Sequence, residues 1–71
     1  MRDRGIDVRK LRARLSMSQH EFATRFGLNI LTLRDWEQGR RSPLGPARVL
    51  LELISRSPDD VMRTLETLAA D

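Results

Sequence analysis

Residues 17–43 read MSQHEFATRFGLNILTLRDWEQGRRSP, and this stretch decides the fold. Ser18 followed by Glu21 three residues later is the capping-box signature of a helix start. Gly27 supplies the stop, because a residue without Cβ tolerates the left-handed conformation that ends helices. We therefore expect a helix of about two turns over 19–26. Its inward face comprises Phe22, Ala23 and Phe26.

A second helix follows almost at once. Asn29 is a favoured N-cap residue, and the apolar spacing predicts a helix over 29–38. Projection at about 100° per residue puts Ile30, Leu33 and Trp36 on the inward face. Two short helices joined by a glycine turn are typical of a device that reads a DNA groove. The outward face, which would meet the groove, comprises Leu31, Arg34, Asp35 and Gln38.

The chain before this stretch predicts an arm and one more helix. Residues 1–6 hold two arginines without hydrophobic periodicity, and we expect a flexible basic arm that either touches DNA or stays solvated. Asp7 is a suitable N-cap for the first helix. The apolar stripe of this helix comprises Val8, Leu11 and Leu15.

The chain after the stretch predicts two further helices. Pro46 suits a first helical position, and we expect a fourth helix from there to about Arg56. Ser57, Pro58 and two following acids form another start signal, for a fifth helix that ends near Ala70. The fourth helix directs Ala47, Leu50, Leu51 and Ile54 inward and leaves Val49 and Leu53 outside.

The fifth helix presents one apolar side. This side either covers the first helix of the same chain, or meets a second copy of the chain, or does both. We expect dimerisation through this helix and the region before it, because such proteins usually read two half-sites through a twofold dimer. A purely intramolecular lid is the alternative. The expected interface comprises Val61, Met62, Leu65 and Leu68.

The spacing of these residues resembles a known family, the helix-turn-helix domains of phage repressors and their bacterial relatives. The likeness extends from about Val8 to Val61, most of the chain. It implies an all-α, five-helix, lambda-repressor-like fold. The residues that carry the resemblance are Ser18-Gln19, Phe22-Ala23, Gly27, Thr32-Leu33, Trp36-Glu37, Gly39 and Pro43.

Within that family the chain looks most like the small antitoxins of bacterial toxin-antitoxin operons, the kind paired with mRNA-cleaving toxins of the RelE type. The segments that suggest it are 34–41, RDWEQGRR, and 43–48, PLGPAR, which leads into an apolar helix. The resemblance implies a repressor of its own operon that also binds a toxin. Such antitoxins often add a segment for wrapping the toxin, and only residues 1–7 precede the first helix here. The sequence therefore does not locate a toxin-binding surface. A simple phage-like or chromosomal regulator without a toxin is the alternative.

Composition sets independent limits. A chain of 71 residues makes one domain with a thin core, so oligomerisation would supplement its stability. No cysteine and a single histidine, His20, leave no disulfide, zinc site or thiol nucleophile, which argues against an enzyme and against a metal or cofactor. No apolar run approaches the ~20 residues that span a bilayer, and the start lacks a signal-peptide core. We expect a cytoplasmic protein with a basic arm, 1–6, and a DNA-binding domain, 7–71.

Charge is divided unevenly along the chain. Residues 1–41 hold ten Arg or Lys against five acids, whereas residues 42–71 hold three against five. A basic half that contains the groove-reading surface is the electrostatic pattern expected of a nucleic-acid binder. The acidic half is left for solvent or a protein partner. Twelve of the thirteen cations are Arg, whose planar fork suits phosphate, although biased genome composition explains this equally well.

The predicted DNA contacts follow from position. Gln19, just inside the second helix, would hold a phosphate with its side chain and free amide, the role that the resemblance implies for it. The first turn of the recognition helix would read bases. Arg40 and Arg41 leave the end of that helix on a loop that suits phosphate contact; a solvated pair is the alternative. The first-turn residues are Asn29, Ile30, Leu31 and Thr32.

Three outward side chains have two interpretations each. Leu31 departs from the polar or basic residue common in relatives, and would pack on a thymine methyl or contact a partner protein. Arg34 would reach guanine or phosphate. Asp35 would accept from a cytosine amino group or orient Arg34. Gln38 completes the predicted contact surface.

The resemblance also implies a structural ion pair. The family places a basic residue near the middle of the first helix against the acid that follows the Trp36 position. In this sequence those residues are Arg12 and Glu37. Two separate solvated charges are the alternative.

Two rival functions remain open. One is a protein-interaction module, which would be a dimer scaffold or toxin-neutralising subunit with weak or no DNA binding. Leu31 is the residue that favours this alternative. The other is an RNA binder, which would need exposed aromatics for base stacking. We expect all three aromatic residues, Phe22, Phe26 and Trp36, in the core.

Overall fold

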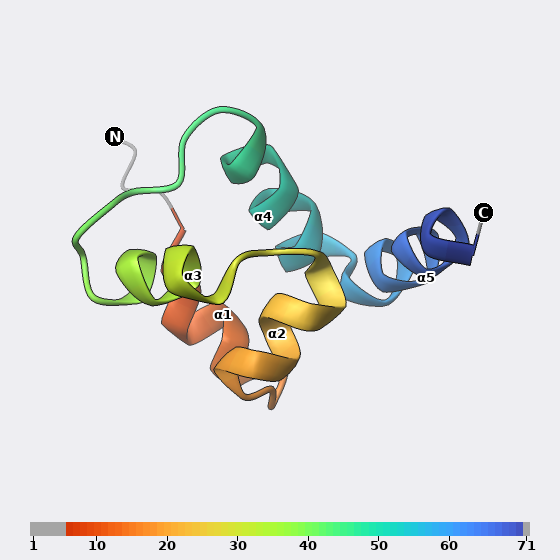
Figure 1. The fold of residues 1–71 in the computed structure, drawn as a ribbon, viewed down its shortest axis with the longest axis horizontal. Coiled ribbons are helices and arrows are strands. Elements are labelled where there is room, and N and C mark those ends of the chain that lie inside the picture. The colour runs from red at the N-terminus through yellow and green to blue at the C-terminus, as the bar shows by residue number, and fades with distance from the viewer. Residues whose placement is uncertain (1–5, 71) are drawn as a thin grey trace.

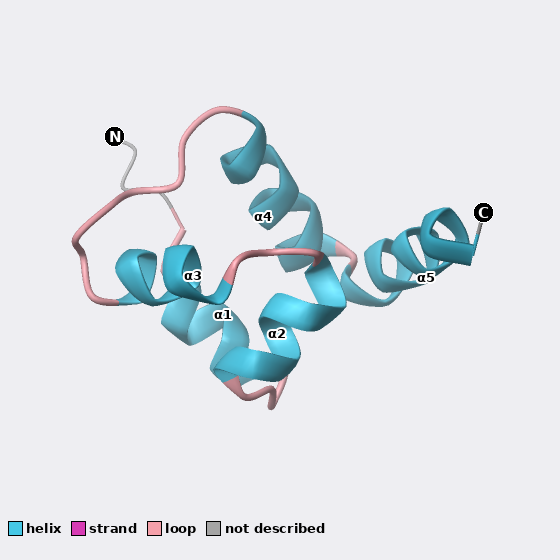
Figure 2. Cartoon of the chain, in the orientation of Figure 1, coloured by secondary structure: helices cyan, strands magenta, loops and turns pink. Residues whose placement is uncertain are grey.

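The computed structural model describes residues 6–70, and this part of the chain folds into five helices joined by short loops (Figures 1 and 2). No helix within residues 6–70 is both long and apolar enough to cross a membrane. The predicted arm lies outside the described residues except for Ile6, which packs against the core. The helices are α1 (Val8–Arg14), α2 (Gln19–Phe26), α3 (Ile30–Glu37), α4 (Pro46–Arg56) and α5 (Pro58–Ala70).

Local caps set the starts of the first three helices, as predicted. Asp7 Oδ1 accepts from the Lys10 amide at 3.0 Å, and Ser18 Oγ accepts from the amide three residues on at 3.0 Å. The Oδ1 of Asn29 accepts from two amides of α3, at 2.8 and 3.3 Å. Gly27 ends α2 with a φ of 69°. This is the left-handed conformation expected of a glycine that stops a helix.

The core is small and draws on the first four helices. Phe22 and Phe26 stack in a tilted pair with ring centroids 4.8 Å apart. Trp36 is only half-buried and packs against the edge of this core. Helix α3 therefore rests on α1 and α2 while its other side faces solvent. The buried residues are Val8, Leu11, Phe22, Ala23, Phe26, Leu33, Leu51 and Ile54.

Helix α4 buries the expected side. Leu51 and Ile54 are fully buried, Ala47 and Leu50 are half-buried, and the residues expected outside are exposed. Arg14 ties α1 to the end of this helix, since its Nη2 donates to the Ser55 carbonyl at 2.7 Å.

Helix α5 does not cover α1, which corrects one of the two expected roles of its apolar side. It packs mainly on α4 and α2, and it extends to one side of the other four helices (Figure 1). Val61, Met62 and Leu65 are half-buried against the core, whereas Leu68 is 63% exposed. The apolar side is thus divided between intramolecular packing and solvent.

Candidate nucleic-acid interface

Helices α2 and α3 form the predicted two-helix unit, with residues 27–29 as the turn between them (Figure 1). The outward side of α3 is open: Leu31 is 63% exposed, and Arg34 and Gln38 are exposed beside it. Among the predicted contact residues, Gln19, Ile30, Thr32 and Asp35 are half-buried. The exposed ones are Asn29, Leu31, Arg34, Gln38, Arg40 and Arg41.

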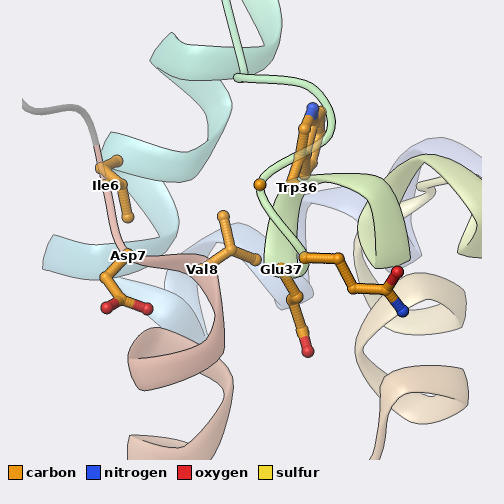
Figure 3. Close-up of a pocket in the computed structure, with 7 residues that line it drawn as sticks. Ile6, Asp7, Val8, Trp36 and Glu37 are labelled. Atoms are coloured by element: carbon orange, nitrogen blue, oxygen red, sulfur yellow. The ribbon is translucent and has the colours of Figure 1, made fainter.

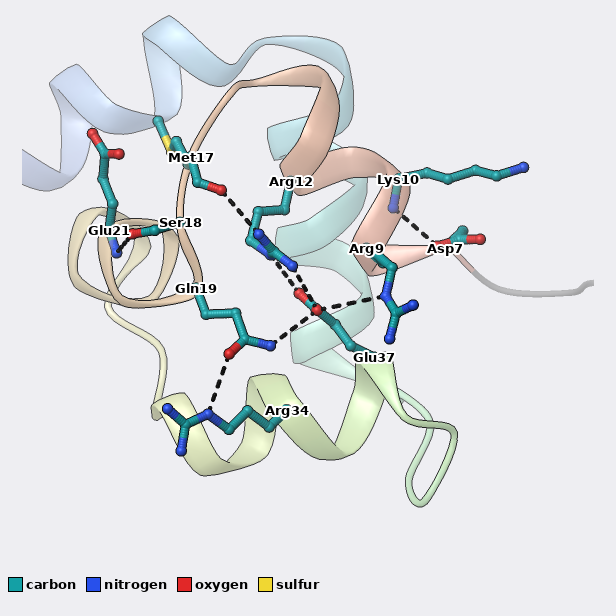
Figure 4. Close-up of polar contacts among 10 residues, drawn as sticks. All are labelled: Asp7, Arg9, Lys10, Arg12, Met17, Ser18, Gln19, Glu21, Arg34 and Glu37. Atoms are coloured by element: carbon teal, nitrogen blue, oxygen red, sulfur yellow. Dashed lines mark hydrogen bonds and ion pairs between the residues drawn. The ribbon is translucent and has the colours of Figure 1, made fainter.

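The ion pair between Arg12 and Glu37 is present, as predicted. The guanidinium binds the carboxylate through two bonds, Nε to Oε2 at 2.7 Å and Nη2 to Oε1 at 2.8 Å (Figure 4). The Glu37 side chain is 1% exposed and that of Arg12 is 20% exposed. Arg12 Nη1 also donates to the Met17 carbonyl at 3.0 Å. One buried pair therefore joins α1, the α1–α2 turn and the end of α3.

Hydrogen bonding governs the charge state of this pair. The bond from Arg12 lowers the pKa of Glu37, burial opposes that shift, and the bond from Gln19 and the charges of Arg12 and Arg9 reinforce it. Arg9 is the more distant of the two cations, with its Nε 3.9 Å from the carboxylate and a side chain 65% exposed. The pKa of Arg12 is raised, chiefly by its hydrogen bond to the same carboxylate. Both groups are held in their charged forms.

Gln19 makes contacts that the sequence prediction missed. Its Nε2 donates to Glu37 Oε1 at 3.1 Å, and its Oε1 accepts from Arg34 Nε at 3.3 Å (Figure 4). The side chain that was expected to hold a phosphate is thus engaged within the protein at both ends. Residues 34 and 37 lie three apart on one face of α3, where a single amide can reach both, but only the packing of α2 against α3 brings Gln19 to them.

Asp35 braces a different arginine from the one expected. Its Oδ1 pairs with Arg40 Nε at 3.1 Å, and its carbonyl accepts from the amides of Arg40 and Arg41 at 2.9 and 3.3 Å. In this structure Asp35 therefore orients Arg40 rather than Arg34. The acid instead folds the arginine loop back against the end of α3.

The residues of the first turn of α3, which were predicted to read bases, differ in their contacts and exposure. Asn29 uses its side-chain oxygen to cap the helix, and Ile30 and Thr32 are half-buried. Leu31 is the residue of this turn whose side chain is large, apolar and exposed.

A cleft of about 470 Å³ opens between the start of α1 and the end of α3 (Figure 3). Sequence reasoning did not identify it. Within the described part of the chain, no three His, Cys, Asp or Glu side chains come together as a metal site. The residues that line the cleft are Ile6, Asp7, Val8, Trp36, Glu37, Gln38 and Gly39.

Comparisons with known proteins agree with this geometry. A family model described as "Helix-turn-helix" matches residues 8–47. Antitoxin HigA-2 of Vibrio cholerae serotype O1 is 35% identical over 60 residues, which cover 84% of this chain and 58% of that antitoxin. This chain thus spans somewhat more than half the length of that relative.

A solved structure gives the same answer at the level of the fold. The crystal structure of an HTH XRE-family-like protein from Agrobacterium tumefaciens superposes with a TM-score of 0.81 at 39% identity, covering 83% of this chain and 95% of that one. The five helices, the two-helix unit and the matched family model lead to one conclusion. The chain belongs to the helix-turn-helix family, as a member of its XRE type.

Proposed function

We propose that the chain represses its own operon by binding operator DNA in a sequence-specific manner, as a twofold dimer. The observation that carries this proposal is the outward side of α3, which leaves Leu31, Arg34 and Gln38 exposed beside the start of α2. A recognition helix whose outward side is exposed and flanked by arginines fits a major groove between two phosphate backbones. A DNA target also implies work in the cytoplasm.

Each part of this surface has a proposed contact. The free amide of Gln19 at the start of α2 would hold one phosphate, and Arg40 and Arg41 would hold others beyond the end of α3. Asp35 would steer Arg40 toward the backbone. The residues proposed to face base edges are Leu31, Arg34 and Gln38, with Asn29, Ile30 and Thr32 supporting the first turn.

Titration against DNA tests the proposal. The purified chain is added to a labelled fragment of its own promoter, and to a scrambled fragment of the same composition. We expect selective binding that disappears when Arg34 and Arg40 are both changed to Ala, with Arg56→Ala as a control because that side chain is 81% exposed on α4. Equal or negligible binding of both fragments by a folded protein would favour the protein-interaction module instead.

We further propose a dimer interface on α5 and on the side of α4 that borders α5. A groove of about 370 Å³ runs between these helices and is mainly apolar. Leu53 borders it at 52% exposure, and Val49 and Leu68 are also exposed nearby in the sequence. The proposed interface therefore adds α4 residues to the predicted set of Val61, Met62, Leu65 and Leu68.

A toxin partner is the finer part of the proposal. It is supported by the similarity to an antitoxin and by exposed apolar side chains outside the DNA-facing surface, such as Leu44 at 74%. Co-expression with the product of the neighbouring gene tests it. A complex that co-purifies and relieves growth arrest by a RelE-type toxin is the expected result, and a neighbour that is neither toxic nor bound would contradict it.

A further inference from the structure

The side-chain amide of Gln19 fills the space between a buried carboxylate and an exposed arginine. Its nitrogen lies 3.1 Å from Glu37 Oε1, and its oxygen lies 3.3 Å from Arg34 Nε. A carboxylate only accepts hydrogen bonds, so the nitrogen end of the amide must face Glu37. The oxygen is then left for Arg34. The orientation of Gln19 is thus dictated by the charge beneath it.

This orientation constrains Arg34 at one nitrogen. Nε is engaged with Gln19, and the two terminal nitrogens point away from Gln19 and from the ion pair (Figure 4). A guanidinium held in this way presents two parallel donors at its free end. That spacing matches O6 and N7 of guanine in the major groove, the commonest specific arginine contact.

We propose that Gln19 is a positioning residue for Arg34, and that the pair reads a guanine in each half-site. The inference rests on the proposed function and refines it, since it assigns one base to one side chain. It also moves the Gln19 side chain from phosphate binding to specificity. The phosphate contact is left to the backbone amide at the start of α2.

The anchor of this arrangement is rigid. The Glu37 side chain is 1% exposed and is fixed by two short bonds from Arg12, which itself holds the Met17 carbonyl. A free arginine side chain loses much rotamer freedom when it binds, and that loss weakens affinity. An arginine already tethered to the core through Gln19 loses less. The tether therefore strengthens the guanine contact selectively.

Selection from a library of random duplexes serves as the probe, because it reveals the preferred bases even when the operator sequence is unknown. Wild-type protein should enrich a site with one guanine per half-site. Replacing this guanine by adenine should weaken binding of the protein about tenfold. 7-Deazaguanine, which lacks the N7 acceptor, should weaken binding there as well. Arg34→Ala should lose the preference altogether.

The decisive variant is Gln19→Met, which keeps the side-chain length but removes both hydrogen bonds. We expect the guanine preference to fall about fivefold, with the preference at other positions unchanged and the urea midpoint close to wild type. Adding Gln19→Met to Arg34→Ala should change the preference no further. His20→Ala, at the neighbouring exposed position, serves as the matched control and should retain the preference.

The outcomes separate the two levels of the argument. A Gln19→Met protein that keeps its full guanine preference would overturn the positioning role. If that protein also loses affinity equally for every sequence, the phosphate role is restored. An Arg34→Ala protein with unchanged base preference would overturn the guanine contact. A folded wild-type protein that enriches no sequence would refute sequence-specific binding itself.

Discussion

The carboxylate of Glu37 accepts three hydrogen bonds, two from Arg12 and one from Gln19, while its side chain is 1% exposed. A charge in such a place is stable only with its partners, because burial without them leaves it poorly solvated. The sequence predicted the pair from its family pattern. It could not predict Gln19, because an amide suits a phosphate or a carboxylate equally well and only the packing of α2 against α3 selects one.

Removal of one partner should be costly. Arg12→Met keeps much of the side-chain volume but leaves Glu37 buried without its main counter-charge, and we expect a loss of about 3 kcal/mol in the free energy of unfolding. Urea unfolding measures it. The double variant with Glu37→Met should recover a large part of the loss. Arg9→Ala, at the exposed end of the cluster, should cost less than about 1 kcal/mol; a similar loss for Arg9 and Arg12 would contradict this account.

The same carboxylate should make stability depend on acid pH. Its pKa is lower in the folded protein than the value of about 4.3 in an unfolded chain. Its contribution is therefore present above about pH 4.3 and is lost as the pH falls through the folded pKa. Urea midpoints of wild type and Glu37→Gln should differ most near neutral pH and converge as the pH falls. A gap that stays constant down to about pH 3 would show that Glu37 does not titrate in this way.

Leu31 gives a prediction about DNA at the level of one methyl group. An exposed leucine has no hydrogen bond to offer a base, but it packs on the methyl group of thymine. Replacing each thymine of the half-site by deoxyuridine should cost wild type about 1 kcal/mol at one position and should leave Leu31→Ala unaffected. Fluorescence anisotropy measures both. Indifference of wild type to every such replacement would assign Leu31 to a protein partner.

At the level of elements, helix limits were predictable because their signals are local. Asp7, Ser18 and Asn29 cap their own helices, and Gly27 ends its own. The packing of α5 was not predictable in the same way, because its apolar side matches several neighbours and only the chain path through Ser57 sets it against α4 and α2. The sequence thus allows several neighbours for the apolar side of α5, and the folded chain selects α4 and α2 among them.

The α4–α5 surface predicts a variant that separates folding from assembly. Leu53 is 52% exposed, so Leu53→Lys should leave the monomer folded while it places a charge in the proposed interface. We expect the mass measured by sedimentation to change from that of a dimer to that of a monomer. Affinity for a two-half-site operator should fall at least about tenfold, because the second half-site no longer binds within the same complex.

A matched control lies on the loop between α3 and α4. Leu44→Lys introduces the same charge at a residue that is 74% exposed and outside the proposed interface. This protein should remain a dimer. A Leu53→Lys protein that still sediments as a dimer would place the interface elsewhere, and a monomeric wild type would remove it.

At the level of the whole molecule, the uneven charge predicts a steep salt dependence. If each subunit contacts about three to five phosphates, a dimer releases the counterions of about six to ten, and affinity should fall by about 10³ to 10⁵ between about 50 and 200 mM salt. Arg40→Ala should reduce the slope by about one per subunit. Arg56→Ala should leave the slope unchanged. A shallow slope for wild type would mean that DNA is not its main partner.

The exposed side of α3 has an evolutionary consequence. Leu31 and Gln38 point to solvent and contribute little to the core, whereas Leu33 beneath them is fully buried. Exchanges at the outer positions therefore leave the scaffold folded. Duplicated copies of such a gene are free to diverge in the sites they recognise while they keep one architecture. A single cell can in this way carry several regulators of the same shape without crosstalk between their circuits.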